Sequence, residues 1–216
     1  MLLDTSIAPR TRPSVLPHGT AFVPDWGTVY TEGDVTLLTR PSVAIIGSRD
    51  ASPEGRALAG AFAAELVSRN IVVVSGLAAG IDSAAHEATM QAGGRTIAVI
   101  GTSLDKAYPK QHAARQARIA SDHLVVSPFA VGAPTARWHF PRRNRLMAHI
   151  ALATVLVEAG STSGTRHQVE ACIALGRPVL VHESLLGRDI DWLDVAHRRG
   201  QLHAWLKPLG AYPRRA

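Results

Sequence analysis

Only one cysteine, Cys172, occurs among the 216 residues, so no disulfide bond can form within the chain. It lies in the apolar stretch VEACIALG, which predicts a buried structural thiol and not a reactive one. Apolar runs all stop well short of the ~20 residues that a membrane-spanning helix needs, and the opening MLLDTSIAPR lacks the basic start and apolar core of a secretory signal. Together these absences predict a soluble, cytoplasmic protein with no membrane partner.

Acidic residues are outnumbered as well. Aspartate and glutamate total 17 against 23 lysines and arginines, which gives a formal net charge of +6. Much of the surplus is arginine, whose planar guanidinium binds phosphate or carboxylate through two parallel hydrogen bonds. The imbalance favours a polyanionic partner, although it says nothing about the fold.

Short apolar runs alternate with segments of helical character. The expected strands are 42–47, 71–76, 96–101, 123–127, 153–160 and 178–183, and the expected helices are 52–70, 82–94, 111–120 and 165–175. Continuous apolar strands that alternate with helices predict an α/β fold with a doubly wound, mostly parallel sheet covered on both faces.

Three segments are expected along the chain. Residues 1–24 contain prolines and hydroxyl side chains without periodicity, which predicts a loosely ordered N-terminal arm. Residues 25–186 hold the strands and helices of the α/β domain. Residues 187–216 are interpreted as a short C-terminal helix and a basic tail, too small to form a second domain.

Glycine and hydroxyl residues follow the central strands, at the edge of the sheet where ligands of such folds bind. These loops are Gly47-Ser48-Arg49, Ser75-Gly76 through Gly80, Gly101-Thr102-Ser103 with Lys106 and Lys110 beyond it, and Gly160 through Ser163-Gly164-Thr165. Each loop precedes a helix, whose free amide groups attract anions. The repeated pattern, with basic residues beside it, predicts an anion-binding edge.

The stretch FPRRNRLMAHIA, residues 140–151, places three arginines within four positions beside a fully apolar run. Pro141 is suited to a helix start, so Arg142, Arg143 and Arg145 fall in the first turn, where the helix macrodipole disfavours positive charge. An anionic ligand would compensate for that conflict. We therefore expect the arginines to form a rigidly mounted phosphate clamp.

Spacing excludes several other chemistries. GSRDASPEG has the wrong glycine spacing for a dinucleotide-binding turn, and GTRHQVE lacks the lysine of a Walker loop. Asp82 and His86 lie four residues apart without a third metal ligand at a matching position, so Asp82 is expected to cap its helix. No serine has the histidine, acid and local context of a nucleophile. We expect no cofactor, no metal and no catalysis.

Four segments resemble, in order, the core motifs of the DprA/Smf family of DNA-processing proteins. They are PSVAIIGSRDASPEGRALA, VVVSGLAAGIDSAAHEATMQAGGRTIAVIGTSLDKAYPKQH, FPRRNRLMAHIALATVLVEAGSTSGT and ALGRPVLV, and the similarity extends over roughly residues 26–183. SGLAxGID and FPxRNR are highly specific motifs. The resemblance implies an extended Rossmann-like fold that binds single-stranded DNA without catalysis. It also implies a homodimer that helps to load a RecA-type recombinase during natural transformation.

The resemblance places strand-binding residues in the GSR motif and around FPxRNR, with further contacts in the loop that holds Lys106 and Lys110. Together with the glycine loops, the expected DNA- and phosphate-binding set is Gly47, Ser48, Arg49, Gly76, Lys106, Lys110, Phe140, Arg142, Arg143, Asn144, Arg145, Ser163, Gly164 and Thr165. Phe140 and Trp138 are expected either to stack on a splayed base or to pack in the core.

The sequence departs from the family pattern in several places. Ser127-Pro128 replaces the usual Ser-Glu after the fourth strand, HESLLG replaces the Pro-Gly after the last strand, and the glycine- and asparagine-rich segment beyond it is missing. The flanks are also too short for the helical domain and the winged helix found beside the family's core. A minimal form of the family is therefore expected.

Two other functions stay open. Lysine-decarboxylase-like nucleotide phosphoribohydrolases share the wider fold group and have a glutamate three residues after the threonine of GGxGT. Here that position holds Gln168, which cannot act as a carboxylate base, and Glu170 falls on another helix face. The second alternative is a sensor domain that binds a nucleotide-derived ligand in the same loops.

Overall fold

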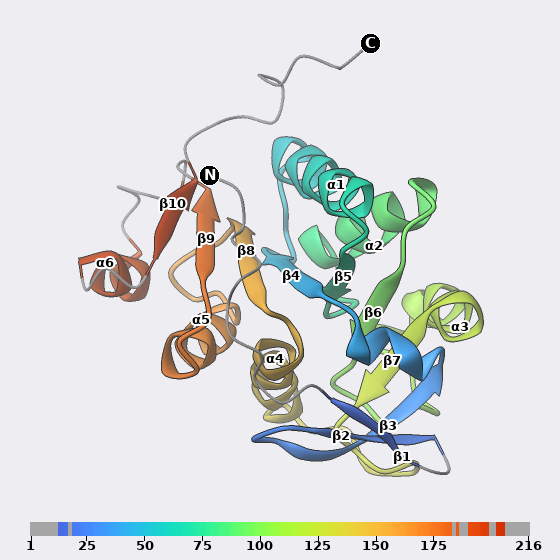
Figure 1. Cartoon of the computed structure of the whole chain (residues 1–216). Coiled ribbons are helices and arrows are strands. Elements are labelled where there is room, and N and C mark those ends of the chain that lie inside the picture. The colour runs from blue at the N-terminus through green and yellow to red at the C-terminus, as the bar shows by residue number, and fades with distance from the viewer. Residues whose placement is uncertain (1–12, 17–18, 183–184, 186–189, 199–201, 206–216) are drawn as a thin grey trace.

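The computed structural model describes residues 13–16, 19–182, 185, 190–198 and 202–205 (Figure 1). Within them one ten-stranded sheet has the order β1-β2-β3-β7-β6-β5-β4-β8-β9-β10. The strands are β1 (Ser14–Leu16), β2 (Thr20–Val23), β3 (Gly27–Gly33), β4 (Ser42–Gly47), β5 (Val72–Ser75), β6 (Thr96–Val99), β7 (Leu124–Ser127), β8 (Ala153–Glu158), β9 (Val179–His182) and β10 (His203–Trp205). From β7 to β10 every neighbouring pair is parallel, whereas β1, β2 and β3 pair antiparallel and β3 joins β7 antiparallel.

Helices cover both faces of the sheet (Figure 1). They are α1 (Pro53–Ser68), α2 (Ile81–Gln91), α3 (Ala113–Asp122), α4 (His139–Ile150), α5 (Arg166–Ala174) and α6 (Asp191–Arg198), with 3-10 turns η1 (Val35–Thr39) and η2 (Lys110–His112). Side chains of β4 alternate between the faces: Val43 and Ile45 pack with α1 and α2, whereas Ala44 and Ile46 pack with α4 and α5. Full burial of one such isoleucine contributes about 1.5–3 kcal/mol to folding. The predicted doubly wound α/β fold is confirmed.

The strand order reverses at β4. Strands β5, β6 and β7 follow on one side of it, while β8, β9 and β10 follow on the other. In open α/β sheets this reversal leaves a crevice beyond the carboxyl ends of the two strands that flank it, here β4 and β8. The crevice is the place where the fold offers a ligand site.

The N-terminal region differs from the loosely ordered arm predicted for residues 1–24. Within it β1 and β2 form strands of the sheet, and β2 continues through a turn into β3. Ala21 and Val23 of β2 and Val29 of β3 are fully buried, so this hairpin extends the core. The two strands are short, and the turn at residues 24–26 interrupts the alternation of buried and exposed side chains, so the sequence pattern does not indicate them. Residues 1–12 lie outside the described part.

The C-terminal region contains the predicted short helix, α6, and also a strand that the sequence pattern did not indicate. This strand, β10, pairs parallel with β9, so β9, α6 and β10 make a further βαβ unit. The basic tail, residues 206–216, falls outside the described residues. No described helix combines the length and apolar character needed to span a membrane.

One of two predicted helix starts agrees with the structure. Ser52 caps α1, since its Oγ accepts a hydrogen bond from the Gly55 amide at 2.9 Å, and Pro53 is the first helical residue. Helix α4 begins at His139, two residues before the predicted start at Pro141. Arg142 therefore ends the first turn, whereas Arg143 and Arg145 lie in the second turn and not, as was predicted, in the first.

Candidate functional site

The loops after the central parallel strands gather at the carboxyl edge of the sheet. They comprise residues 48–52 after β4, 76–80 after β5, 100–109 after β6 and 159–165 after β8. Helix α4 packs on the face of the sheet opposite α1 and α2, and its Arg143 reaches the ends of β5 and β6 at the same edge. Every segment of the predicted anion-binding edge thus reaches one side of the molecule.

Arg143 lies inside this edge and not on its surface. Its side chain is buried, and Nη1 donates to the Gly76 carbonyl oxygen and, at 2.7 Å, to that of Val99. A Cβ at Gly76 would overlap the guanidinium, so glycine is required there. Arg143 therefore joins the ends of β5 and β6, a placement that does not fit the predicted phosphate clamp.

Asp82 provides a negative charge close to Arg143. It is 6% exposed, and its Oδ2 accepts a hydrogen bond from the Ala78 amide at 3.3 Å. Burial raises the pKa of Asp82, and the positive charges of Arg143 and Arg49 oppose that rise. Burial likewise lowers the pKa of Arg143 to about 10, and Asp82 opposes that fall. The two buried charges stabilise each other.

Asp82 was expected to cap its helix, but the structure gives it another role. Helix α2 begins after Gly80, which has a positive φ of 75° and no side-chain cap. The Asp82 carboxylate instead holds the loop that precedes the helix. His86 is buried, with Nδ1 2.7 Å from Thr96 Oγ1. Across the described residues no three His, Cys, Asp or Glu side chains gather in a metal-binding arrangement.

Arg49 forms an exposed cluster with two aromatic rings. Its guanidinium carbon lies 5.6 Å from the ring centroid of Phe140, within the range of a cation–π contact. The Phe140 ring, half-buried, lies 5.0 Å from the ring of Tyr108 at an interplanar angle of 48°. A Cβ at Gly101 would come within 2.7 Å of Phe140 Cδ1, so this glycine leaves room for the ring. A cation and an aromatic surface are thereby presented side by side.

Ser48 fixes the backbone from which Arg49 projects. Its Oγ donates to the Asp50 carbonyl oxygen at 2.9 Å, and its own carbonyl accepts from the Ile81 amide at 3.1 Å. The backbone at Gly47 is equally confined, since a Cβ there would approach Ile81 Cγ1 at 2.5 Å. Ser48 and Gly47 thus shape the loop, while Arg49 remains exposed.

A second exposed arginine, Arg145, lies on the β8 side of the point where the strand order reverses, which we call the switch point. Arg145 borders an open hollow of about 340 Å³ together with the loop of residues 161–164. Asn144 supports that loop, because its Nδ2 donates to the Gly164 carbonyl oxygen at 2.8 Å. Ser163 Oγ lies 2.8 Å from the Thr165 hydroxyl and so fixes the loop from within. Among the described residues neither Arg49 nor Arg145 has an acidic ion-pair partner.

The other predicted basic residues have different environments. Lys106 donates through Nζ to the Ala133 carbonyl oxygen at 2.9 Å, which ties two loops together. Arg142 turns toward the N-terminal hairpin, where its guanidinium carbon lies 5.1 Å from the Trp26 ring centroid. Lys110 is exposed at the start of η2. Lys110 therefore lies on the surface near the edge, whereas Lys106 and Arg142 have contacts of their own.

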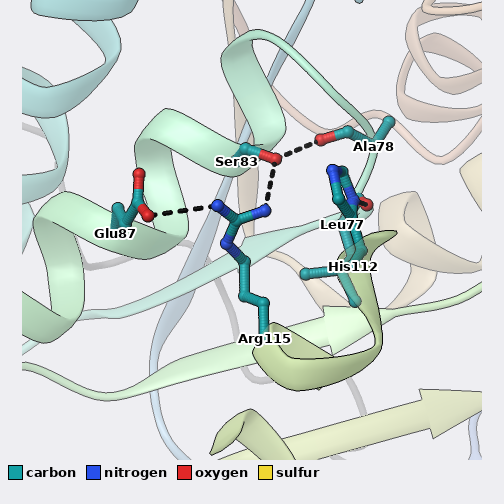
Figure 2. Close-up of polar contacts among 6 residues, drawn as sticks. All are labelled: Leu77, Ala78, Ser83, Glu87, His112 and Arg115. Carbon is teal, nitrogen blue, oxygen red and sulfur yellow. Dashed lines mark hydrogen bonds and ion pairs between the residues drawn. The ribbon is translucent and has the colours of Figure 1, made fainter. Parts of the chain in front are cut away.

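Sequence reasoning missed the residues that hold the loop after β5. Figure 2 shows His112 of η2 beside this loop and Arg115 of α3 bonded to helix α2, which follows the loop. His112 Nδ1 lies 2.8 Å from the Leu77 carbonyl oxygen. Arg115 donates to Ser83 Oγ at 3.2 Å and to Glu87 Oε1 at 3.1 Å, while Ser83 Oγ donates to the Ala78 carbonyl at 2.7 Å. The loop is therefore anchored from two helices.

Gln168, which occupies the position of the catalytic glutamate in the hydrolase alternative, is not exposed at the carboxyl edge of the sheet. Gln168 is fully buried, and its Nε2 donates to Thr154 Oγ1 of β8 at 3.1 Å. Glu170 is exposed and pairs with Arg166 at 2.7 Å. Gln168 is thus a core residue, and the position that would carry a catalytic carboxylate does not open onto the loops.

Comparisons with known proteins agree on one family. Residues 23–191 match the family model described as DNA recombination-mediator protein A. DNA processing protein DprA of Streptococcus pneumoniae is 42% identical over 151 residues, 70% of this chain and 53% of the relative. Protein Smf of Escherichia coli is 33% identical over 162 residues, 74% of this chain and 43% of the relative. The chain spans about half the length of these two relatives.

Solved structures give the same result. The crystal structure of DprA from S. pneumoniae superposes with a TM-score of 0.74 at 38% identity, covering 82% of this chain and 63% of that one. DprA from Helicobacter pylori, described for its single-stranded DNA binding mode, gives 0.76 at 27% identity, with 90% and 89% covered. A molybdenum cofactor carrier protein from Chlamydomonas reinhardtii, 17% identical with a TM-score of 0.54 and 78% and 90% covered, shares the fold alone.

Proposed function

The chain belongs to the DNA recombination-mediator protein A family, and we propose that it binds single-stranded DNA, without catalysis, at the carboxyl edge of its sheet. The observation that carries the proposal is the exposed cluster of Arg49, Phe140 and Tyr108. A single strand presents phosphates and unpaired bases together. Proteins that bind it combine cations for the first with aromatic rings for the second.

The phosphates are bound on either side of the switch point. Arg49 follows β4 and Arg145 borders the hollow beyond β8, so the two exposed guanidinium groups lie on adjacent parts of one edge. Between them the N-terminus of α1 is already capped, since the Gly55 amide donates to Ser52 Oγ and the Ser52 amide donates to the Glu158 carboxylate. The exposed arginines therefore supply the phosphate contacts. Each neutralised phosphate releases counterions, which makes the affinity depend steeply on salt. The DNA-binding description of the H. pylori relative supports this assignment.

The buried members of the predicted set have supporting roles. Arg143 and Gly76 shape the edge from within, and Asn144, Ser163 and Thr165 hold the loop beside Arg145. They keep the exposed groups in place before DNA arrives, which lowers the ordering cost of binding. Mutation of these residues affects binding through the fold.

Finer aspects of the function rest on family membership. We propose that the protein acts in the cytoplasm as a homodimer and delivers the bound strand to a RecA-type recombinase during recombination or natural transformation. A strand held on an exposed edge by its phosphates stays open to a second protein along its length. Light scattering of the protein with oligonucleotide, with and without recombinase, tests both assemblies by mass.

The binding proposal is tested by titrating three ligands into the protein at several salt concentrations. They are an oligothymidylate of about 20 nucleotides, a duplex of equal length and thymidine monophosphate. We expect the oligothymidylate to bind most tightly, with an affinity that falls log-linearly as salt rises. Preference for the mononucleotide with a shallow salt dependence would instead identify a nucleotide sensor. Release of ribose 5-phosphate from a nucleoside monophosphate would identify a hydrolase.

A further inference from the structure

Tyr108 is a large aromatic residue at the surface. It is 55% exposed, whereas Thr102 and Ser103 earlier in the same loop are buried. The Tyr108 ring contacts Phe140, with 5.0 Å between the ring centroids. Phe140 is in turn flanked by Gly101 and Arg49. Phe140 is thus partly enclosed, and Tyr108 is the ring of the pair that solvent reaches most freely.

The loop that presents Tyr108 is fixed on both sides. Before it, Thr102 Oγ1 donates to the Lys106 carbonyl at 2.7 Å, and Gln116 Nε2 donates to the Leu104 carbonyl at 3.0 Å. After it, the η2 turn is held by the contact of His112 with Leu77 (Figure 2). These contacts fix the backbone on both sides of Tyr108, so the loop holds the residue at the carboxyl edge of the sheet.

We infer that Tyr108 is a stacking platform for an unpaired base, with Phe140 packed behind it; this inference rests on the proposed function. An aromatic ring beside a guanidinium suits a base whose phosphate is bound next to it. Every base has a π-face, so the platform accepts any sequence and requires only that the base be free of a duplex. Tyr108 therefore adds a base-dependent contribution to the phosphate binding of Arg49.

The inference is tested by removing the ring and the base separately. Tyr108→Ala, Tyr108→Phe and wild type are titrated with oligothymidylate and with an abasic strand of the same length. We expect Tyr108→Ala to bind oligothymidylate about tenfold more weakly, since one stacked base contributes about 1–3 kcal/mol. Tyr108→Phe should bind like wild type. On the abasic strand all three should bind alike, because the ring has nothing to stack on.

A second measurement uses the unmutated protein. Oligonucleotide carrying 5-iodouracil is irradiated in the complex, and the cross-linked peptide is identified by mass spectrometry. Attachment at Tyr108 is expected, and attachment confined to other segments overturns the inference. Equal binding of oligothymidylate by Tyr108→Ala and wild type overturns it too, and if Arg49→Ala is weakened in the same assay, the proposed function stands. Absence of oligonucleotide binding by wild type overturns both.

Discussion

The guanidinium of Arg143 donates to the carbonyl oxygen of Gly76, so helix α4 on one face of the sheet is joined to the loop that follows β5. Arg143 and Arg145, two residues apart on this helix, therefore point in different directions. Arg143 turns into the edge with the apolar side of the helix, whereas Arg145 stays exposed on the surface. The motif thus combines a residue that builds the site with one that is free to meet a ligand.

Replacement of Arg143 by methionine should destabilise the fold by about 3–5 kcal/mol, because the buried Asp82 would lose the stronger of the two positive charges that stabilise it. The carbonyls of Gly76 and Val99 would also lose a donor. Urea unfolding measures the change. Arg145→Ala, on the same helix but exposed, is the control and should stay within about 0.5 kcal/mol of wild type. Wild-type stability of Arg143→Met would disprove the structural role.

Stability should fall in acid because of His86. Burial, helped by the nearby positive charges, lowers the pKa of His86 from 6.5 to about 3. Between these values the unfolded chain binds a proton at this residue that the folded protein does not, so the free energy of unfolding decreases as pH falls. The slope approaches about 1.4 kcal/mol per pH unit.

Urea unfolding at several pH values from neutral to acidic compares wild type with His86→Asn, which does not titrate. The variant should lose this part of the slope. A residual slope will remain, since burial also lowers the pKa of His123 and of His139. Identical slopes in the two proteins would contradict the assignment.

Gly101→Ala should weaken DNA binding without changing any charge. The new Cβ would lie 2.7 Å from Phe140 Cδ1 and would displace the ring that supports Tyr108 and Arg49. We expect the affinity for oligothymidylate to fall about three- to tenfold, because part of the stacking energy of one base would be lost. Gly60→Ala is the matched control, because its Cβ meets only Ala88 Cβ at 3.5 Å. If both variants bind like wild type, the Phe140 position does not matter for binding.

The order of strands and helices could be predicted because each central strand is a continuous apolar run. Such runs are buried on both faces, and this property needs no knowledge of the neighbours. The N-terminal hairpin could not be predicted with the same rule. Its strands are short, and the burial of Ala21 and Val23 depends on a sheet that the later sequence provides.

The loops and arginines of the site could be predicted from the sequence, but not which of the arginines are buried and which are exposed. Arg143, Leu146, Met147 and Ile150 recur at helical spacing, and all four are buried, so the face could have been recognised in the sequence. Three arginines within four positions concealed that pattern, because charge alone does not show which side chain turns inward. Tyr108 was missed for a different reason. It lies in a loop, where exposure depends on tertiary contacts and not on periodicity.

The most direct test of the account compares the salt dependence of oligothymidylate binding in wild type, Arg49→Ala and Arg145→Ala. Arg69→Ala is the control, since Arg69 is an exposed arginine at the C-terminal end of α1, where it pairs with Glu65. Between about 50 and 200 mM salt each site variant should bind less tightly at every point, with the slope of log affinity against log salt reduced by about 0.7, the value for one phosphate contact on a single strand. The account is contradicted if both site variants keep the affinity and slope of wild type and of Arg69→Ala.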